Sequence, residues 1–210
     1  VQASLLMGAT IVLYDGSPGY PDLDVLWQLT EEAGIHHFGT SAPYLVACMK
    51  QELTPGKSFD LSTLRSIGST GAPLPPESFD WVYDRVKADL QLSSISGGTD
   101  IISCFALGSP VLPVRRGELQ CRGLGMAVAV YDDDGAELAG EPGELVCTRS
   151  FPSMPTGFWN DDDGGATMVP GGPGLTRYAI GVSGAPGGEK DAECALEALA
   201  KLEERLEFAD

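Results

Sequence analysis

One stretch of the sequence, 61-LSTLRSIGSTGAPL-74, indicates the architecture of the chain. The stretch Leu64–Ser69 predicts a strand, and the turn-forming residues Gly71-Ala72-Pro73 follow it. A helix is then expected to begin at Pro75-Pro76-Glu77, because proline is tolerated in a first helical turn. A strand that leads through a glycine-containing turn into a helix is typical of α/β proteins with parallel sheets.

The same alternation of strands and helices continues on both sides of this stretch. Apolar residues at helical spacing follow Pro21, and Gly34 suits the position just after a helix end. A second helix is expected to begin with Ser41 as its N-cap. Further strands are predicted at Ala9–Tyr14, Ile35–Thr40 and Leu90–Ser96. We therefore expect an α/β fold with a parallel sheet and crossover helices.

The second half of the chain has a different pattern, dominated by β-strands. Strands are predicted at Met126–Tyr131 and Glu144–Thr148, and Asp132–Gly135 reads as a turn between them. These features predict a small β-subdomain attached to the α/β part. We place the α/β part at residues 1–110 and the β-subdomain at residues 111–163.

The end of the chain changes character again. Residues 164–188 contain nine glycines and three prolines in 25 positions. The segment has too few large apolar side chains to offset the conformational entropy lost when the backbone is ordered. We therefore expect a loose loop. Residues 189–210 are predicted to form an amphipathic helix, docked on the core or, alternatively, binding a partner. Its apolar stripe is Leu196, Leu199, Leu202 and Leu206.

The charge balance restricts the classes of partner. Lys and Arg number 13 against 30 Asp and Glu, so the formal net charge is −17. Such a field repels nucleic acids and anionic membrane surfaces, and we expect the chain to bind neither. A phosphate-bearing small molecule remains compatible, because local backbone dipoles hold it rather than the net charge.

The cysteines and the start of the chain give two further expectations. Five cysteines, never closer than 17 residues, match neither a disulfide framework nor a zinc site, so we expect reduced thiols in the cytoplasm. No apolar run approaches the ~20 residues of a membrane span. Because the chain begins without Met on an apolar stretch, we interpret it as part of a longer protein.

Two glycine-marked strand ends are the candidate site. The loop Gly71-Ala72-Pro73 follows one predicted strand, and Ser96-Gly97-Gly98-Thr99-Asp100 follows another. Ligands of parallel sheets bind outside the carboxyl ends of the strands, so both loops are expected to line one crevice. Glycine lets backbone N–H groups approach an anion, the Thr99 hydroxyl can donate to a phosphate oxygen, and the Asp100 carboxylate can bind Mg²⁺. Taken alone, both loops are also compatible with ordinary turns.

Five blocks of sequence in order resemble the adenylate-forming acyl-CoA synthetases. They cover about residues 5–163, and the blocks Ser96–Asp100 and Phe151–Pro155 point to the members of the family that activate acetoacetate. The blocks are GATIVLYDGSP (8–18), FGTSAP (38–43), LSTLRSIGSTGAPL (61–74), SGGTD (96–100), and GELV (143–146) with PSMP (152–155) and GFWN (157–160).

The resemblance implies an adenylation domain and a two-step ligase reaction. The acid carboxylate would attack the α-phosphate of ATP to give acyl-AMP and pyrophosphate, and the thiol of CoA would then displace AMP. By this resemblance Gly71-Ala72-Pro73 packs against adenine, Ser96–Thr99 belongs to the nucleotide site, Thr99 contacts the α-phosphate, and Asp100 helps to hold Mg²⁺. Donors and metal at that phosphate stabilise developing charge.

Two positions in the second loop depart from the common family motif. Ser96 stands where the family usually has an aromatic residue that stacks on adenine. Gly97 stands where acetate-activating members carry a Trp that closes the acyl pocket, so the resemblance implies space for the longer acetoacetate. Thr70 is expected to line the same pocket. One pocket residue discriminates by only about 1–3 kcal/mol per methylene, so acetate, propionate or another 3-oxo acid remains an alternative.

Other family elements have no match in this sequence. We find no phosphate loop, no ribose-binding aspartate and no C-terminal domain with a catalytic lysine, and the resemblance ends after Asn160. We therefore expect that the 210-residue chain does not complete the reaction alone. The alternatives are a module that binds nucleotide or acyl-AMP without turnover, and a non-functional remnant.

Overall fold

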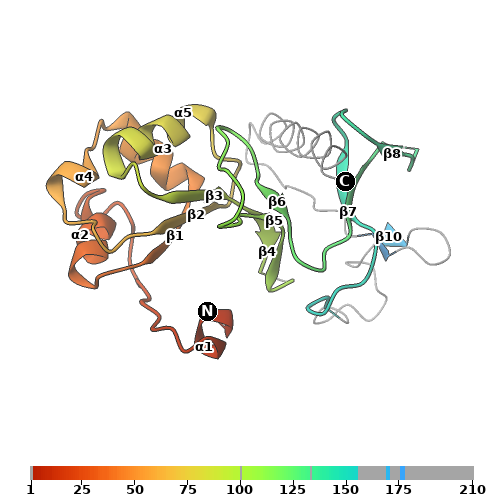
Figure 1. Ribbon diagram of the computed structural model, residues 1–210, viewed down its shortest axis with the longest axis horizontal. Coiled ribbons are helices and arrows are strands. Elements are labelled where there is room, and N and C mark those ends of the chain that lie inside the picture. Colours follow the sequence, from red (N-terminus) through yellow and green to blue (C-terminus); the bar gives the residue numbers. More distant parts are fainter. Residues whose placement is uncertain (1, 100, 133, 156–168, 171–175, 178–210) are drawn as a thin grey trace.

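The computed structural model describes residues 2–99, 101–132, 134–155, 169–170 and 176–177. A parallel sheet and its helices form one end of the elongated molecule, and the antiparallel strands lie toward the other end (Figure 1). None of the described helices has the length and apolar character needed to cross a membrane.

The parallel sheet contains three of the predicted strands. They are β1 (His37–Ser41), β2 (Ser66–Thr70) and β3 (Gln91–Ser94), hydrogen-bonded in the order β1-β2-β3 and parallel throughout. Their register aligns the apolar residues Phe38, Ile67 and Leu92 in one row across the sheet. The predicted α/β architecture is therefore confirmed for this part of the chain.

Local capping signals define the helices around this sheet. The Oγ of Ser41 accepts a hydrogen bond from the N–H of Tyr44 at 3.4 Å, as expected for an N-cap. Gly34 has φ of +60°, which favours glycine just after a helix. The helices are α2 (Val25–Glu32), α3 (Ala42–Lys50), α4 (Pro55–Ser58) and α5 (Pro76–Trp81), and α5 continues into the π-turn η1 (Val82–Val86).

The first hydrophobic core lies on one face of the parallel sheet. The row Phe38, Ile67 and Leu92 packs in one buried cluster with side chains of α2, α3, α5 and η1, among them Trp27, Leu45, Phe79 and Val82. Because side chains alternate along a strand, His37 and Gly39 lie on the opposite face, and both are exposed. That face is built from small and polar residues: Gly39, Ser66, Gly68, Gln91 and Ser93.

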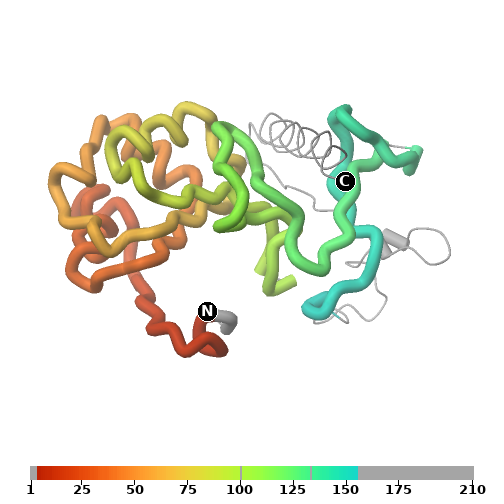
Figure 2. The backbone as a smooth tube through the Cα atoms, viewed as in Figure 1, coloured from red at the N-terminus to blue at the C-terminus, as the bar shows by residue number. Residues whose placement is uncertain are grey.

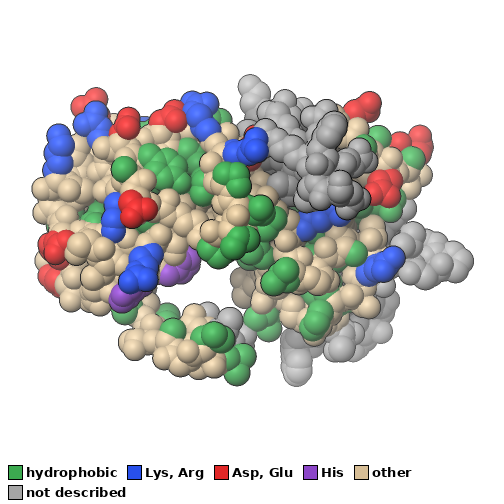
Figure 3. Space-filling view, viewed as in Figure 1, with side chains coloured by type: hydrophobic (Ala, Val, Ile, Leu, Met, Phe, Trp, Pro, Cys, Tyr) green, Lys and Arg blue, Asp and Glu red, His purple; other side chains and the backbone are tan. Residues whose placement is uncertain are grey.

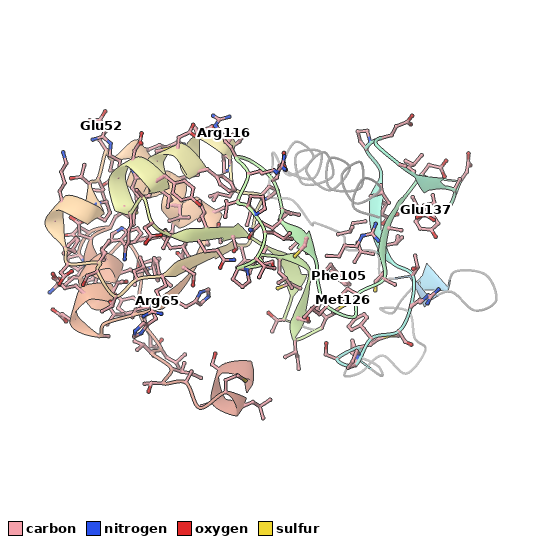
Figure 4. All side chains as sticks on the ribbon, in the orientation of Figure 1. Glu52, Arg65, Phe105, Arg116, Met126 and Glu137 are labelled. Carbon is pink, nitrogen blue, oxygen red and sulfur yellow. The ribbon has the colours of Figure 1, made fainter. Side chains whose placement is uncertain are left out.

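Two antiparallel sheets make up the other end of the molecule. The first contains β4 (Ser96–Gly98), β5 (Ser103–Leu107) and β6 (Cys121–Arg122), in that order. The second has the order β8-β7-β9, from β7 (Val128–Tyr131), β8 (Glu137–Leu138) and β9 (Glu144–Cys147). A second core cluster lies here and includes Phe105, Met126 and Phe151; Figure 4 shows Phe105 and Met126 in the same region.

The predicted strand at Ala9–Tyr14 is wrong. The chain begins with the short helix α1 (Gln2–Leu6) and then runs as an extended, exposed arm, with Leu13 75% exposed. Figure 2 shows this arm leading away from the body of the molecule, and Figure 3 shows hydrophobic side chains exposed on this N-terminal segment. The residues favour a β conformation, but none of the described strands pairs with them, and a strand forms only with a hydrogen-bonded neighbour.

Two other predictions differ from the structure or lie beyond it. The strand predicted at Leu90–Ser96 ends earlier, because β3 ends at Ser94, and Ser96–Gly98 of the predicted loop forms the strand β4. In the loop predicted at 164–188, the described residues form the paired strands β10 (Val169–Pro170) and β11 (Thr176–Arg177). The helix predicted at 189–210 lies outside the described residues, and the domain division at residue 110 stays a prediction.

Candidate functional site

The carboxyl ends of the three parallel strands meet at one edge of the sheet. Ser41, the last residue of β1, is the register partner of Thr70, the last residue of β2. In the same way, Ser69 of β2 is the partner of Ser94, the last residue of β3. The segments that follow β2 and β3 therefore start side by side, where ligands of parallel sheets are bound.

The loop after β2 turns at Gly71, which has φ of +84°. A left-handed residue at this position favours glycine, and the space beside it is open, because a Cβ would come no nearer than 3.9 Å to Ser41. The loop is held by the N–H of Leu74, which donates to the Oγ of Ser94 at 3.4 Å. Ala72 and Pro73 are half-buried.

The segment after β3 crosses directly from one sheet to the next. The N–H of Ile95 donates to the carbonyl of Ser69 at 2.9 Å, and β4 begins at the following residue. Ser96 and Gly98 are half-buried, whereas Gly97 and Thr99 are exposed. The structure thus brings Thr70–Pro73 and Ser96–Thr99 to the same edge of the sheet; Asp100 lies outside the described residues.

Gly97 has a structural role that the sequence did not reveal. It lies in β4 beside β5, and a Cβ built on it would collide with the carbonyl oxygen of Ser103 and lie 2.6 Å from the Cα of Cys104. The register between β4 and β5 also shifts between Ser96 and Gly97, as in a β-bulge. The close approach of the two backbones therefore requires glycine here, whatever the size of the acyl pocket.

The turn after β4 contains a strained residue. The N–H of Ile102 donates to the carbonyl of Thr99 at 3.2 Å, and Ile102 has φ of +50°. A β-branched residue in this conformation costs about 1–3 kcal/mol. Ile101 is buried while Ile102 is 64% exposed, so burial of Ile101 fixes the turn. Nothing in the sequence pattern signals this strain.

The polar side chains of the described residues at this edge carry hydroxyl groups: Ser41, Thr70, Ser94, Ser96 and Thr99. Among the described residues, no three His, Cys, Asp or Glu side chains gather in a group that could hold a metal ion. The Oγ of Ser69 is fully buried and has no hydrogen-bond partner in the described part of the chain. Hydroxyls and backbone amides at this edge are the donors that a phosphate group accepts.

Comparison with known proteins finds one matching family and several similar relatives. Residues 1–159 match the family described as AMP-binding enzyme. Acetoacetyl-coenzyme A synthetase of Rhizobium meliloti (strain 1021) is 56% identical over 162 residues, which is 77% of this chain and 25% of the relative. Acetoacetyl-CoA synthetase of Gallus gallus is 48% identical over 161 residues, 77% of this chain and 24% of the relative. The chain thus spans about a quarter of the length of these relatives.

Solved structures agree with this assignment. The acetoacetyl-CoA synthetase from Streptomyces lividans superposes with a TM-score of 0.76 at 47% identity, covering 84% of this chain and 28% of that protein. A more distant structure, the anthranilate CoA ligase AuaEII, has a TM-score of 0.67 at 20% identity and supports the fold alone.

Proposed function

The chain belongs to the AMP-binding enzyme family, and we propose that it carries part of the adenylate-forming site of an acetoacetate–CoA ligase. In the first step the acetoacetate carboxylate attacks the α-phosphorus of ATP, and pyrophosphate leaves. In the second step the CoA sulfur attacks the acyl carbon of acetoacetyl-AMP, and AMP leaves. The observation that carries this proposal is the identity of 47–56% to acetoacetyl-CoA synthetases over the segment that contains both loops.

Each loop has a role in the proposed reaction. Gly71-Ala72-Pro73 forms the surface on which adenine packs, since it leaves β2 at the open edge of the sheet. The exposed hydroxyl of Thr99 donates to an oxygen of the α-phosphate and stabilises the charge that develops there. We assign backbone N–H groups of Gly97 and Gly98 to the same phosphate as further donors.

A single carboxylate from the chain is sufficient for an Mg²⁺ ion that is bound together with a nucleotide. Mg²⁺ is usually held by one or two carboxylates, by water and by the phosphates of the substrate. We assign this role to the carboxylate of Asp100, the residue that follows Thr99 in the sequence. When bound, the ion would neutralise charge on the phosphates during the attack.

The acyl pocket is proposed to include Thr70 and Gly97. Both are exposed at the edge where the two loops begin. Because Ser96 has no aromatic ring, adenine packs on Ala72 and Pro73 in this proposal. A ligase for acetate, propionate or another 3-oxo acid is the alternative, and a comparison of acids decides between them.

The proposed reaction sets the expected partners and location. The partners are acetoacetate, ATP and CoA; protein partners are not assigned. Because acetoacetate is a ketone body, the protein would act in lipid metabolism, and we propose a cytoplasmic location. The net charge of −17 supports the expectation that neither nucleic acid nor a membrane is bound.

Calorimetric titration of the chain with AMP and with ATP·Mg²⁺ tests the site. We expect Thr99→Val to weaken both ligands about 3- to 10-fold, since it removes one hydrogen bond to a charged group. Asp100→Asn should weaken ATP·Mg²⁺ more than AMP, because only the former brings the cation.

Two matched variants control for general effects. Thr10→Val changes the same residue type on the exposed arm, and Asp84→Asn does so on the exposed side of η1. Both should bind as the unmodified chain does. Absence of binding by the unmodified chain at millimolar nucleotide would contradict a preformed site, and acetoacetyl-CoA synthesis by the 210 residues alone would contradict the expected incompleteness.

A further inference from the structure

The side chain of Gln120 holds a turn of backbone with all of its hydrogen-bonding groups. Its Oε1 accepts from the N–H of Ser109 at 3.1 Å, and its Nε2 donates to the carbonyls of Ser109 at 3.2 Å and Leu112 at 3.0 Å. Gln120 is only 9% exposed. An amide that satisfies both backbone groups of one residue acts like a neighbouring strand and fixes the turn between β5 and β6.

Gln120 also connects this turn to the parallel sheet. The Oγ of Ser93, in β3, donates to the Oε1 of Gln120 at 3.4 Å. The contact is close, because a Cβ on Gly108 would collide with the Oγ of Ser93 and lie 2.6 Å from its Cβ. Ser93 faces the side of the sheet away from the first core, so the turn covers β3 there.

The contact lies beside the crossing that forms the candidate site. Ser93 precedes Ile95 by two residues, and β4 begins at Ser96, while Gln120 directly precedes β6. Since β4 and β6 both pair with β5, a shift at Gln120 changes the position of β4. A second link on the same connection is the exposed ion pair between the Nε of Arg116 and the Oδ2 of Asp80 in α5, 2.9 Å apart. Arg116 is labelled in Figure 4.

We propose that Gln120 is a positioning residue for the nucleotide site: through Ser93 and the turn 108–112 it holds the Ser96–Thr99 segment in place beside the Gly71–Pro73 loop. The inference rests on the proposed function for its ligand, adenine nucleotide. It requires no contact between Gln120 and the ligand.

The test uses Gln120→Glu, which keeps the shape of the side chain and removes the two donations from Nε2. We expect the Kd for AMP to rise about 10-fold, the effect of losing hydrogen bonds to a buried turn. Hydrogen exchange of the backbone amides of residues 96–99, measured without ligand, should become about 10-fold faster. Ser93→Ala removes the link to Gln120, together with the hydrogen bond that the Oγ of Ser93 accepts from the Nε2 of Gln91 at 3.4 Å. It should produce the same changes, about 2- to 3-fold in size, and it decides the matter if Gln120→Glu does not fold.

The control is another side chain that holds a backbone segment by several hydrogen bonds, far from the carboxyl ends of the parallel strands. The Nζ of Lys87 donates to the carbonyls of Leu61, Ser62 and Leu64, which precede β2. Lys87→Met removes these bonds and should leave both AMP affinity and exchange at 96–99 unchanged. Equal effects of Lys87→Met and Gln120→Glu would show general destabilisation and overturn the proposal.

The two measurements separate this inference from the proposed function. Unchanged exchange at 96–99 in Gln120→Glu overturns the positioning role, and so does unchanged AMP affinity in a chain that binds AMP. If the unmodified chain does not bind AMP, the proposed function fails, and the exchange measurement alone decides on the role of Gln120.

Discussion

Gly97 and Cys104 lie so close across the β4–β5 pair that a Cβ on Gly97 would come within 2.6 Å of the Cα of Cys104. Both backbones are fixed by strand pairing, so neither moves aside without loss of hydrogen bonds. We predict that Gly97→Ala lowers the free energy of unfolding by about 1–3 kcal/mol, measured by urea denaturation.

The matched control is Gly39→Ala, in β1. A Cβ there meets no atom within 4 Å, so the variant should unfold at the same urea concentration as the unmodified chain. Equal stability of Gly97→Ala would contradict the close approach. For the same reason, Gly97→Trp does not probe the acyl pocket cleanly, and Thr70→Val is the better variant for comparing acetoacetate with acetate.

Relief of strain at Ile102 should stabilise the chain. The residue has φ of +50° and its side chain is 64% exposed, so substitution costs little burial. Asparagine adopts this conformation more readily, and Ile102→Asn should raise the free energy of unfolding by about 1 kcal/mol. Val111→Asn serves as control, because Val111 is 86% exposed and is not among the residues with positive φ; it should bring no gain. A loss of stability in Ile102→Asn would refute the strain.

The stability of the fold should decrease as the pH falls through the titration range of His37. Desolvation lowers the pKa of His37, whose Nδ1 lies 2.7 Å from the Oγ of Ser66. The unfolded chain then binds a proton more readily than the folded chain, so this contribution is complete above the unfolded pKa of about 6.5 and is lost below it. Urea denaturation at pH 7.5 and 5.5 should show a smaller loss for His37→Gln than for the unmodified chain; an equal loss would contradict the prediction.

Cys48 should be the slowest of the described thiols to react. Burial raises its pKa, and its side chain is completely enclosed in the first core. Alkylation requires an accessible thiolate, so iodoacetamide at pH 7.5 should modify Cys48 only on unfolding. Peptide mass spectrometry over time measures this, with the half-buried Cys121 as the internal comparison. Modification of Cys48 at the same rate as Cys121 would contradict its enclosure.

Local signals made the parallel half of the molecule predictable. The helix-capping Ser41, the left-handed Gly34 and the strand signal at Leu64–Ser69 each depend on a few neighbouring residues, and the structure confirms all three. The loops after β2 and β3 were expected together because parallel strands end at one edge, and their register places them there.

The missed features depend on contacts between distant residues. Strand β4 contains two glycines and has low intrinsic β-propensity, so only its pairing with β5 makes it a strand. The arm at Ala9–Tyr14 has the opposite character, with β-forming residues but no paired strand in the described structure. The lack of space for a Cβ at Gly97 and the hydrogen bonds of Gln120 to the turn 108–112 both depend on the close approach of distant backbone segments. The periodicity of the sequence does not reveal such contacts.

A single residue, Ile95, separates the parallel sheet from β4, and its N–H is bonded to Ser69. A flexible joint needs several consecutive residues whose backbone angles are free to change, and this connection contains only Ile95. A displacement of β4 therefore also moves the end of β2, where the Gly71 turn begins, through the hydrogen bond between Ile95 and Ser69. Mechanical load on the antiparallel half is transmitted to the nucleotide loop instead of being absorbed in a linker.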